Sequence, residues 1–337
     1  MEQTAPLTPQ LFFDTITAFQ RSAAIKSAVE LDVFTKVAEG KKTAQTIAEA
    51  CDAKERGVRI LCDSLVVMGF LTKENYQYKL SEASAVFLNR HSPAFVGGAI
   101  DFILSPVQMR GFEDLTAAIK QGGSTVSEEG SLAPDSPMWV KFARGMMPMM
   151  MPAAQMMAEK LGFASDRKLK VLDIAAGHGI FGITVAQKYQ NAEIFAVDWT
   201  NVLTVATENA EEFGVAARHH LIEGSAFDVQ YGDGYDVVLV TNFLHHFDKQ
   251  TCETLLKKIH KSLADDGRVL TLEFVPNDDR VSPPSEAMFS LTMLAATPAG
   301  DAYTFAELKE MFANTGFSRS EHIPLAPLPQ HLIVSIK

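Results

Sequence analysis

The chain has 337 residues, of which 47% are hydrophobic and 21% charged, and 41 acidic side chains outnumber 30 basic ones. This length allows two domains or one large one, with a sizeable core. The formal charge of −11 and the lack of a basic stripe disfavour nucleic acid as the main partner, and no apolar run is long enough to span a bilayer. The three cysteines fit neither a disulfide framework nor a CxxC metal site, and the N-terminus does not resemble a signal peptide. We therefore expect a soluble, cytoplasmic protein.

The first 160 residues are predicted to be mostly helical. Apolar residues between Leu11 and Phe34 recur at three- and four-residue spacing, which indicates one or two amphipathic helices. Helices are expected over 43–50 and 54–68, and two short strands within 70–80 around a Lys-Glu-Asn turn. Two helices followed by a hairpin are typical of a winged helix.

Strands and helices alternate from Lys168 onward, after a Gly-, Ser- and Pro-rich stretch over 122–137 that predicts a flexible loop. Strands are predicted over 170–175, 192–198, 219–223, 235–244, 268–275 and 331–336, with a further short strand before the last. Helices are predicted over 179–189, 201–213, 250–263 and 305–314. This alternation predicts an α/β fold with a doubly wound, mostly parallel sheet that binds ligands at the carboxyl ends of its strands. The change of pattern places a domain boundary near residue 160.

A glycine turn follows the first of these strands, in the run Asp173-Ile-Ala-Ala-Gly177-His-Gly179. Glycine lets the backbone turn sharply and lets a ligand lie against it, and the helix beyond presents free N–H groups. The second strand ends at Asp198, where a carboxylate can accept hydrogen bonds from the two hydroxyls of a ribose. The pattern indicates an adenosine-containing cofactor, and the plainer alternative is a turn that only joins strand to helix.

The residues around this turn favour S-adenosylmethionine over NAD. A dinucleotide fold needs G-x-G-x-x-G to seat a pyrophosphate on the helix N-terminus, and here the pattern is Ala175-x-Gly177-x-Gly179 with Gly182 next. Asp173, just before the turn, would repel a pyrophosphate but suits the amino group of an amino-acid tail. A nucleotide-dependent oxidoreductase remains a more distant alternative.

These motifs carry a family resemblance. The run from Val171 to Gly179, with Asp198, resembles motif I and the second acidic motif of class I S-adenosylmethionine-dependent methyltransferases. With the winged-helix front, Phe142-Ala-Arg-Gly-Met146 and Phe243-Leu-His-His-Phe, nearly the whole chain resembles small-molecule O-methyltransferases of the caffeate/hydroxyindole (acetylserotonin) type. The resemblance implies a winged-helix dimerisation domain over 1–160 that contributes to the acceptor pocket. It also implies a seven-stranded, Rossmann-like methyltransferase domain over 161–337.

The resemblance also implies which residues hold the cofactor. Gly177 would touch the methionine moiety and Asp198 the ribose, while Ser225 and Ala226 would lie near the adenine, where Gly224-Ser225 replaces the usual Gly-Asp pair. The full set of implied cofactor contacts is Asp173, Gly177, Gly179, Asp198, Trp199, Ser225, Ala226, Phe227, Thr241 and Asn242.

His245 follows a strongly apolar strand and is the candidate general base. A neutral imidazole with a pKa of about 6.5 can accept a hydroxyl proton while the oxygen attacks a sulfonium methyl. In the resembled family the base is followed by Asp-Trp, whereas His246 and Phe247 follow here. Successive residues of a strand point to opposite sides, so we expect only one of the two histidines to face the cofactor. The plainer alternative is that His245 only hydrogen-bonds the strand end.

The family orients its base with two acids. Glu273 matches the first, and the second position is Ala302, so that carboxylate is absent unless Asp301 replaces it by a shift of one residue. This departure leaves open methylation of carbon or nitrogen on the same scaffold. Metal chemistry is not expected, because His219-His220 and His245-His246 are adjacent pairs whose side chains diverge.

Seven of the 14 methionines lie between Met146 and Met157, on helical segments interrupted by Pro148 and Pro152. Thioether side chains pack well on aromatic rings and suit an adaptable pocket. For most of these seven methionines, ordinary core packing is the simpler interpretation. Guided by the resemblance, we take six residues as candidates for the acceptor pocket: Met109, Phe142, Met146, Met150, Phe289 and Met293.

The winged-helix front allows one function of another class, a ligand-sensing DNA-binding regulator. Its stretch 41–80 has seven basic against five acidic side chains, too few to grip phosphates. In the resembled family this domain dimerises by exchanging N-terminal helices, so we predict a homodimer. We therefore predict that the protein transfers a methyl group from S-adenosylmethionine to a hydroxyl of a small hydrophobic, aromatic acceptor.

Overall fold

The computed structural model describes residues 7–126 and 136–337, so most of the loop predicted over 122–137 lies outside the described residues. The chain divides by its packing into two compact units, between Ile100 and Asp101. Residues 101–160 thus pack with the sheet-bearing unit. The assignment of a dimerisation role to 1–160 and a cofactor role to 161–337 stays a prediction.

The smaller unit is helical with one hairpin, as predicted. Its elements are α1 (Gln10–Ile16), α2 (Ala18–Glu30), α3 (Val33–Ala38), α4 (Ala44–Ala50), α5 (Glu55–Val67), β1 (Leu71–Glu74), β2 (Gln77–Leu80), α6 (Glu82–Phe87) and the 3-10 turn η1 (Gly97–Ala99). The hairpin turn is Asn75-Tyr76, both with positive φ, so the predicted Lys-Glu-Asn turn was placed too early. Lys73 and Glu74 pair with β2 instead.

The core of this unit is built from one face of α5. Val58, Cys62 and Leu65, spaced by four and three residues, are buried together with Ile47 and Tyr78. In contrast, α1 has no buried residue, and the side chains of Leu11, Phe12, Phe13, Ile16 and Phe19 are exposed.

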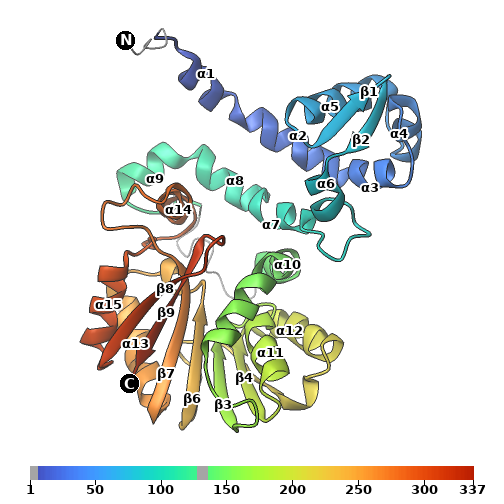
Figure 1. The fold of residues 1–337 in the computed structure, drawn as a ribbon. Coiled ribbons are helices and arrows are strands. Elements are labelled where there is room, and N and C mark those ends of the chain that lie inside the picture. Colours follow the sequence, from blue (N-terminus) through green and yellow to red (C-terminus); the bar gives the residue numbers. More distant parts are fainter. Residues whose placement is uncertain (1–6, 127–135) are drawn as a thin grey trace, which may run out of the picture. The chain divides into compact units, whose positions relative to one another are not determined.

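A seven-stranded sheet forms the centre of the larger unit and confirms the predicted fold class (Figure 1). Its strands are β3 (Leu169–Ile174), β4 (Ala192–Asp198), β5 (His219–Glu223), β6 (Tyr235–Thr241), β7 (Leu263–Phe274), β8 (Arg319–Pro324) and β9 (Gln330–Ile336). The order is β5-β4-β3-β6-β7-β9-β8; the first five strands in this order pair in parallel, and β9 pairs antiparallel with both β7 and β8. Only β9 runs in the opposite direction, so the carboxyl ends of the other six strands lie at one edge.

The larger unit also contains helices, some of which cover both faces of this sheet. They are α7 (Ile100–Ile103, at the division), α8 (Pro106–Glu113), α9 (Leu115–Gln121), α10 (Pro137–Lys160), α11 (Ile180–Lys188), α12 (Thr200–Glu212), α13 (Lys249–Ser262), α14 (Pro284–Ala296) and α15 (Phe305–Asn314), with 3-10 turns η3 (Ala216–Arg218) and η4 (Leu244–His246). Figure 1 shows α11 and α12 on one face and α13 and α15 on the other. Within the described ranges, no helix is long and apolar enough to cross a membrane.

Two of these helices differ from the prediction. α10 runs through both Pro148 and Pro152, so the expected interruption was wrong; the neighbouring turns keep the helix continuous although each proline lacks an N–H. α14 was not predicted, because it is apolar nearly all round and begins at Pro284 after Pro283, which masks its periodicity.

The central strands are buried on both faces, which explains their unbroken apolar runs. Leu172 and Ile174 share one core with Leu256 of α13 and Phe312 of α15. Asp173, between them in the strand, points to the opposite face, where α11 lies.

Candidate active site

The turn after β3 needs glycine at two positions. Gly177 and Gly179 have φ of +59° and +72°, in the left-handed region that costs side chains energy. A Cβ on Gly179 would also lie 3.0 Å from the Cβ of Ala206 in α12. Ala175, with φ +54°, is a non-glycine residue held in the same region. The turn is thus a tight, strained loop that keeps backbone close to whatever binds over it.

Asp173, at the foot of this turn, is fully buried and only half satisfied. Its Oδ2 accepts a hydrogen bond of 3.0 Å from the backbone N–H of Gly182, while Oδ1 has no partner among the described residues. Burial raises the pKa of this carboxyl to about 7. A Cβ on Gly182 would lie 2.8 Å from Oδ2, so this glycine serves the carboxylate rather than a phosphate.

Asp198 ties the end of β4 to the same turn. Its Oδ2 accepts from the N–H of Gly177 at 2.8 Å and its Oδ1 from the N–H of Trp199 at 2.7 Å. Burial raises the pKa of this carboxyl to about 6. The two backbone donors fix the carboxylate beside the glycine turn, as expected from neighbouring parallel strand ends.

The next candidate residues lie in the loop after β5. Ser225, Ala226 and Phe227 occupy this loop, and the amino group of Lys258 donates to the carbonyls of Ala226 and Phe227 at 3.0 and 2.8 Å. Tyr231 donates its hydroxyl to the carbonyl of Ala226 as well. Lys258 and Tyr231, which were not among the predicted site residues, therefore hold this loop in place.

Strand β6 ends at Thr241, at the same edge of the sheet. Asn242 breaks the strand with a φ of +51°, and its side-chain Oδ1 is buried without a partner among the described residues. Its Nδ2 points to the sulfur of Met150 at 3.7 Å. A second unsatisfied buried oxygen thus lies one strand away from that of Asp173.

His245 is buried in the 3-10 turn η4 and bound to Glu273. Its Nδ1 lies 2.5 Å from Oε2 of Glu273, whose Oε1 accepts from the N–H groups of Phe243 and Leu244 at 3.0 and 2.8 Å. The carboxylate therefore fixes both the turn and the ring. The Nε2 of His245 makes no hydrogen bond with any residue that the structure describes.

The two histidine rings do not point to opposite sides, as the strand alternation predicted, because their centroids lie only 4.4 Å apart. Strand β6 ends at Thr241, and both histidines lie in the 3-10 turn η4. The alternation of side chains along a strand therefore does not apply to them. His246 packs edge-on against Trp139 at 5.6 Å, and burial, then the neighbouring His245, lower its pKa well below the usual value. Only His245 contacts the carboxylate.

No second carboxylate reaches His245 from the loop before α15. Ala302 is fully buried, and the carboxylate of Asp301 pairs with Arg280 at 3.0 Å. Asp301 therefore does not replace the missing acid. A Cβ on Gly300 would lie 2.2 Å from the carbonyl of His245, so the loop backbone itself lies directly against the histidine turn.

Apolar candidates from α10 reach the same edge. Phe142 stacks on His178 at 6.2 Å, and a Cβ on Gly177 would lie 3.8 Å from its ring. Met146 and Met150 are buried, and the sulfur of Met150 also receives the side-chain N–H of Gln330 at 3.8 Å. Phe142 and Met150 thus contact the predicted cofactor residues directly.

Helix α14 brings a second apolar wall. The ring of Phe289 meets His245 edge-on at 4.8 Å and stacks on Phe274 at 4.1 Å, and Met293 is buried one turn further along. Met109 of α8 is 39% exposed, and no contact places it beside His245. Five of the six acceptor candidates are therefore buried or in contact near the edge, and Met109 is not.

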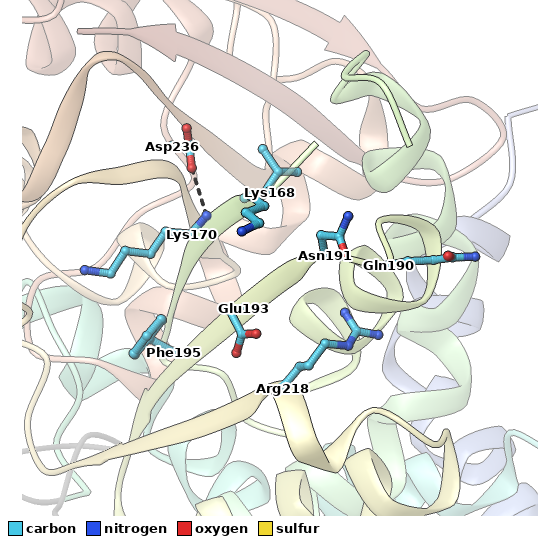
Figure 2. Close-up of a pocket in the computed structure, with 9 residues that line it drawn as sticks. Lys168, Lys170, Gln190, Asn191, Glu193, Phe195, Arg218 and Asp236 are labelled. Carbon is cyan, nitrogen blue, oxygen red and sulfur yellow. Dashed lines mark hydrogen bonds between the residues drawn. The ribbon is translucent and has the colours of Figure 1, made fainter. Parts of the chain in front are cut away.

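A separate hollow of about 510 Å³ lies at the opposite, amino edge of the sheet (Figure 2). It is lined by Lys168, Leu169, Lys170, Gln190, Asn191, Glu193, Phe195, Arg218 and Asp236. Figure 2 shows the carboxylate of Asp236 hydrogen-bonded to the backbone N–H of Lys170. Within the described ranges, no group of three or more His, Cys, Asp or Glu side chains could hold a metal ion.

Comparison with known families matches both parts of the chain. A family model described as "O-methyltransferase domain" matches residues 119–318, and one described as "O-methyltransferase dimerisation domain" matches residues 13–90. The chain is 24% identical to the 3-hydroxy-5-methyl-1-naphthoate 3-O-methyltransferase of Streptomyces sahachiroi over 94% of this chain and 92% of that one. It is 28% identical to the tetracenomycin polyketide synthesis 8-O-methyl transferase of Streptomyces glaucescens, over 89% of each.

Solved structures agree with these matches. A candidate O-methyltransferase from Nostoc punctiforme is 53% identical, with a TM-score of 0.94 over 99% of this chain and 100% of that one. Human N-acetylserotonin methyltransferase in complex with SAM shares the fold at 20% identity, with a TM-score of 0.85 over 100% of this chain and 99% of that one. PigF with SAH does so at 23% identity, with a TM-score of 0.87 over 98% of this chain and 100% of that one.

Proposed function

Because the chain belongs to the O-methyltransferase family, we propose that it transfers a methyl group from S-adenosylmethionine to a hydroxyl of a small, hydrophobic, aromatic acceptor. In this proposal His245 is the general base and Glu273 orients it. The observation that carries the assignment is the buried bond between these two side chains at the carboxyl edge of the sheet.

The carboxyl edge suits this cofactor chemically. Two buried oxygens without partners, Oδ1 of Asp173 and Oδ1 of Asn242, are acceptors that an ammonium group would satisfy. Asp198, held by two backbone N–H groups, would accept from the ribose hydroxyls. When bound, the sulfonium supplies an activated methyl group. In support, the human and PigF structures named above carry SAM and SAH, respectively.

The other implied contacts follow from position. Gly177 and Gly179 would bring backbone close to the cofactor, and Trp199 begins the helix beside Asp198. Ser225, Ala226 and Phe227 would line the adenine site from the loop clamped by Lys258, and Thr241 closes the strand end next to Asn242.

His245 is placed to hold a proton during transfer. Since Glu273 binds Nδ1, the ring keeps its proton there and leaves Nε2 free to accept one from a hydroxyl. The Glu273 carboxylate is itself fixed by two backbone N–H groups, so the base is preorganised without a second acid. Alignment of oxygen, methyl carbon and sulfur would supply most of the remaining rate.

The acceptor wall is apolar and rich in rings and thioethers. Phe289 contacts His245, and Met150 contacts Asn242. In this proposal the apolar surface is extended on α10 and α14 by Phe142, Met146 and Met293. Such a lining favours a flat aromatic acceptor over a polar one.

A mass-shift screen of phenols, indoles and polyketides with labelled S-adenosylmethionine tests the proposal. We expect one labelled methyl group on oxygen for at least one aromatic acceptor, and calorimetric binding of S-adenosylhomocysteine but not of NAD. Failure of S-adenosylhomocysteine to bind, or label found only on carbon or nitrogen, would contradict it.

We further propose that the protein is a homodimer formed through the smaller unit. The dimerisation-domain match covers 13–90, and the exposed face of Phe12, Ile16 and Phe19 offers apolar surface for a second copy. Light scattering should give twice the monomer mass, and Phe12→Asp with Phe19→Asp should halve it. Tyr76→Asp, at the exposed hairpin turn, is the control and should leave the mass unchanged.

A further inference from the structure

A second buried Glu–His pair exists in the larger unit, and the proposed reaction does not use it. Glu286 of α14 and His331 of β9 are only 5% and 8% exposed. The Nε2 of His331 lies 3.6 Å from Oε1 of Glu286, which is too long for a direct hydrogen bond.

Two independent features place this pair beside His245 and Glu273. On α14, Glu286 lies three residues before Phe289 and seven before Met293, so all three share one helix face, and Phe289 contacts His245. On the sheet, His331 of β9 is the direct cross-strand partner of Glu273 in β7. Directly opposed residues of antiparallel strands point to the same side, so His331 lies on the same side of the sheet as Glu273.

The protonation of His331 follows from its other neighbour. Its Nδ1 lies 2.6 Å from Nε2 of His322, and burial lowers the pKa of both imidazoles, which favours neutral rings. A proton on Nε2 of His331 faces the Glu286 carboxylate, whereas a lone pair there would repel it. His322 therefore donates to Nδ1 of His331, and His331 presents an N–H toward Glu286.

The Glu286 carboxylate lacks a donor on one oxygen. Oε2 accepts from the hydroxyl of the adjacent Ser285, whereas Oε1 has only the distant N–H of His331. A buried carboxylate is costly without strong donors. An oxygen placed about 2.8 Å from each group would accept from His331 and donate to Oε1, which is the pattern of one hydroxyl.

We propose that Glu286 and His331 recognise a second hydroxyl group of the acceptor, distinct from the one that is methylated. This rests on the proposed function and narrows its substrate class to neutral aromatic molecules with two hydroxyls. An acceptor with a carboxylate at this position is excluded, because it would meet the buried charge of Glu286.

The test compares dihydroxynaphthalenes with the naphthols, which have one hydroxyl, and with hydroxynaphthoates. For the best dihydroxynaphthalene, we expect a KM about tenfold lower than that of either naphthol, the effect of one well-placed hydrogen bond to a charged group. Glu286→Gln and His331→Gln should each raise this KM about tenfold and leave kcat and the naphthol KM within about twofold. Glu310→Gln, on the exposed side of α15, is the matched control and should change nothing.

A purely structural role gives a different result. If Glu286 and His331 only stabilise the packing of α14 near β9, both variants will raise the KM of naphthols and of dihydroxynaphthalenes equally. That outcome overturns the proposal. Equal KM values for the two classes in the unmodified protein overturn it as well.

A binding measurement separates this proposal from the proposed function. Calorimetry of the S-adenosylhomocysteine complex with the dihydroxynaphthalenes needs no turnover. Binding that weakens about tenfold in Glu286→Gln supports the second-hydroxyl site even if no methylation occurs, in which case only the proposed reaction fails. No binding by any dihydroxynaphthalene overturns the site.

Discussion

The hollow at the amino edge of the central sheet and the candidate site at the carboxyl edge differ in the hydrogen-bond partners of their side chains. At the amino edge, the charged side chains around the hollow, Lys168 apart, already have partners: Lys170 donates to the carbonyl of Asp233 at 2.6 Å, and Arg218 donates to that of Ala192 at 2.8 Å. At the carboxyl edge, oxygens of Asp173 and Asn242 are buried without one. The charged lining of this hollow is therefore mostly paired within the protein.

The difference teaches that an open hollow is not by itself a sign of a binding site, because the charged side chains that line it can already be paired within the protein. A folded protein leaves a buried acceptor unpaired at a cost in stability, and that cost is offset when a ligand supplies the donor. Matched substitutions at the two edges can sharpen this contrast or break it.

The largest expected effect is that of His245→Ala at the carboxyl edge. If His245 is the general base, as proposed, its loss should lower kcat by about 100-fold to 10,000-fold while the affinity for S-adenosylhomocysteine stays within about twofold. The control is His220→Ala, which removes the exposed imidazole paired with Glu193 near the amino edge. It should leave kcat unchanged. Turnover close to normal in His245→Ala would refute the assignment of the base.

The next effect is that of Asp173→Asn on the cofactor. The amide oxygen can still accept from Gly182, but the charge facing the amino group is lost, so affinity should fall by about 2 kcal/mol, or about 30-fold. Asp236→Asn, at the amino edge, should leave that affinity unchanged. Calorimetry with S-adenosylmethionine measures the affinity of both variants. An equal loss of affinity in the two would contradict the assignment of cofactor binding to the carboxyl edge.

The same variant should change the pH dependence of stability. Because burial raises the folded-state pKa of Asp173 to about 7, its contribution to stability is lost as the pH rises from about 4 through 7. Without cofactor, Asp173→Asn should therefore melt higher than the unmodified protein at pH 8, and the gap should close toward pH 4. Thermal scans across this range check the sign, and a gap that widens on acidification would contradict it.

Smaller effects are expected from Asp236→Asn itself. It weakens the bonds to the backbone N–H of Lys170 and to Arg167, so the free energy of unfolding should fall by about 1 kcal/mol. Denaturant titration measures this change. No change in stability would mean that these bonds contribute nothing and that the amino edge is not held by its polar contacts.

Much of the fold could be predicted because its signals are local. The ranges predicted for β4, β5 and α15 match the structure residue for residue, and α15 begins with a capping box between Thr304 and Glu307. Asp198 could be placed beside Gly177 because neighbouring parallel strands end at one edge. The contact of His245 with Glu273 was expected from family resemblance.

The remainder depends on long-range packing. The proximity of Glu286 and His331 requires β9 to return antiparallel beside β7 and α14 to pack near β9, and no local pattern in the sequence fixes either. Asp301 was a candidate for the second orienting acid only because it precedes Ala302 in the sequence. Its carboxylate binds Arg280, 21 residues away, instead. Side chains that meet across the fold are invisible to periodicity.

The two prolines inside α10 have a consequence for the proposed acceptor site. Neither Pro148 nor Pro152 can donate to the carbonyl four residues before it, so the turns that carry Met146 and Met150 lack two of the bonds that stiffen a helix. The loss of these bonds makes this segment easier to bend than an uninterrupted helix. We expect related enzymes to acquire broader or narrower acceptors by exchanging side chains within this one stretch, with the chemistry at the strand ends left untouched.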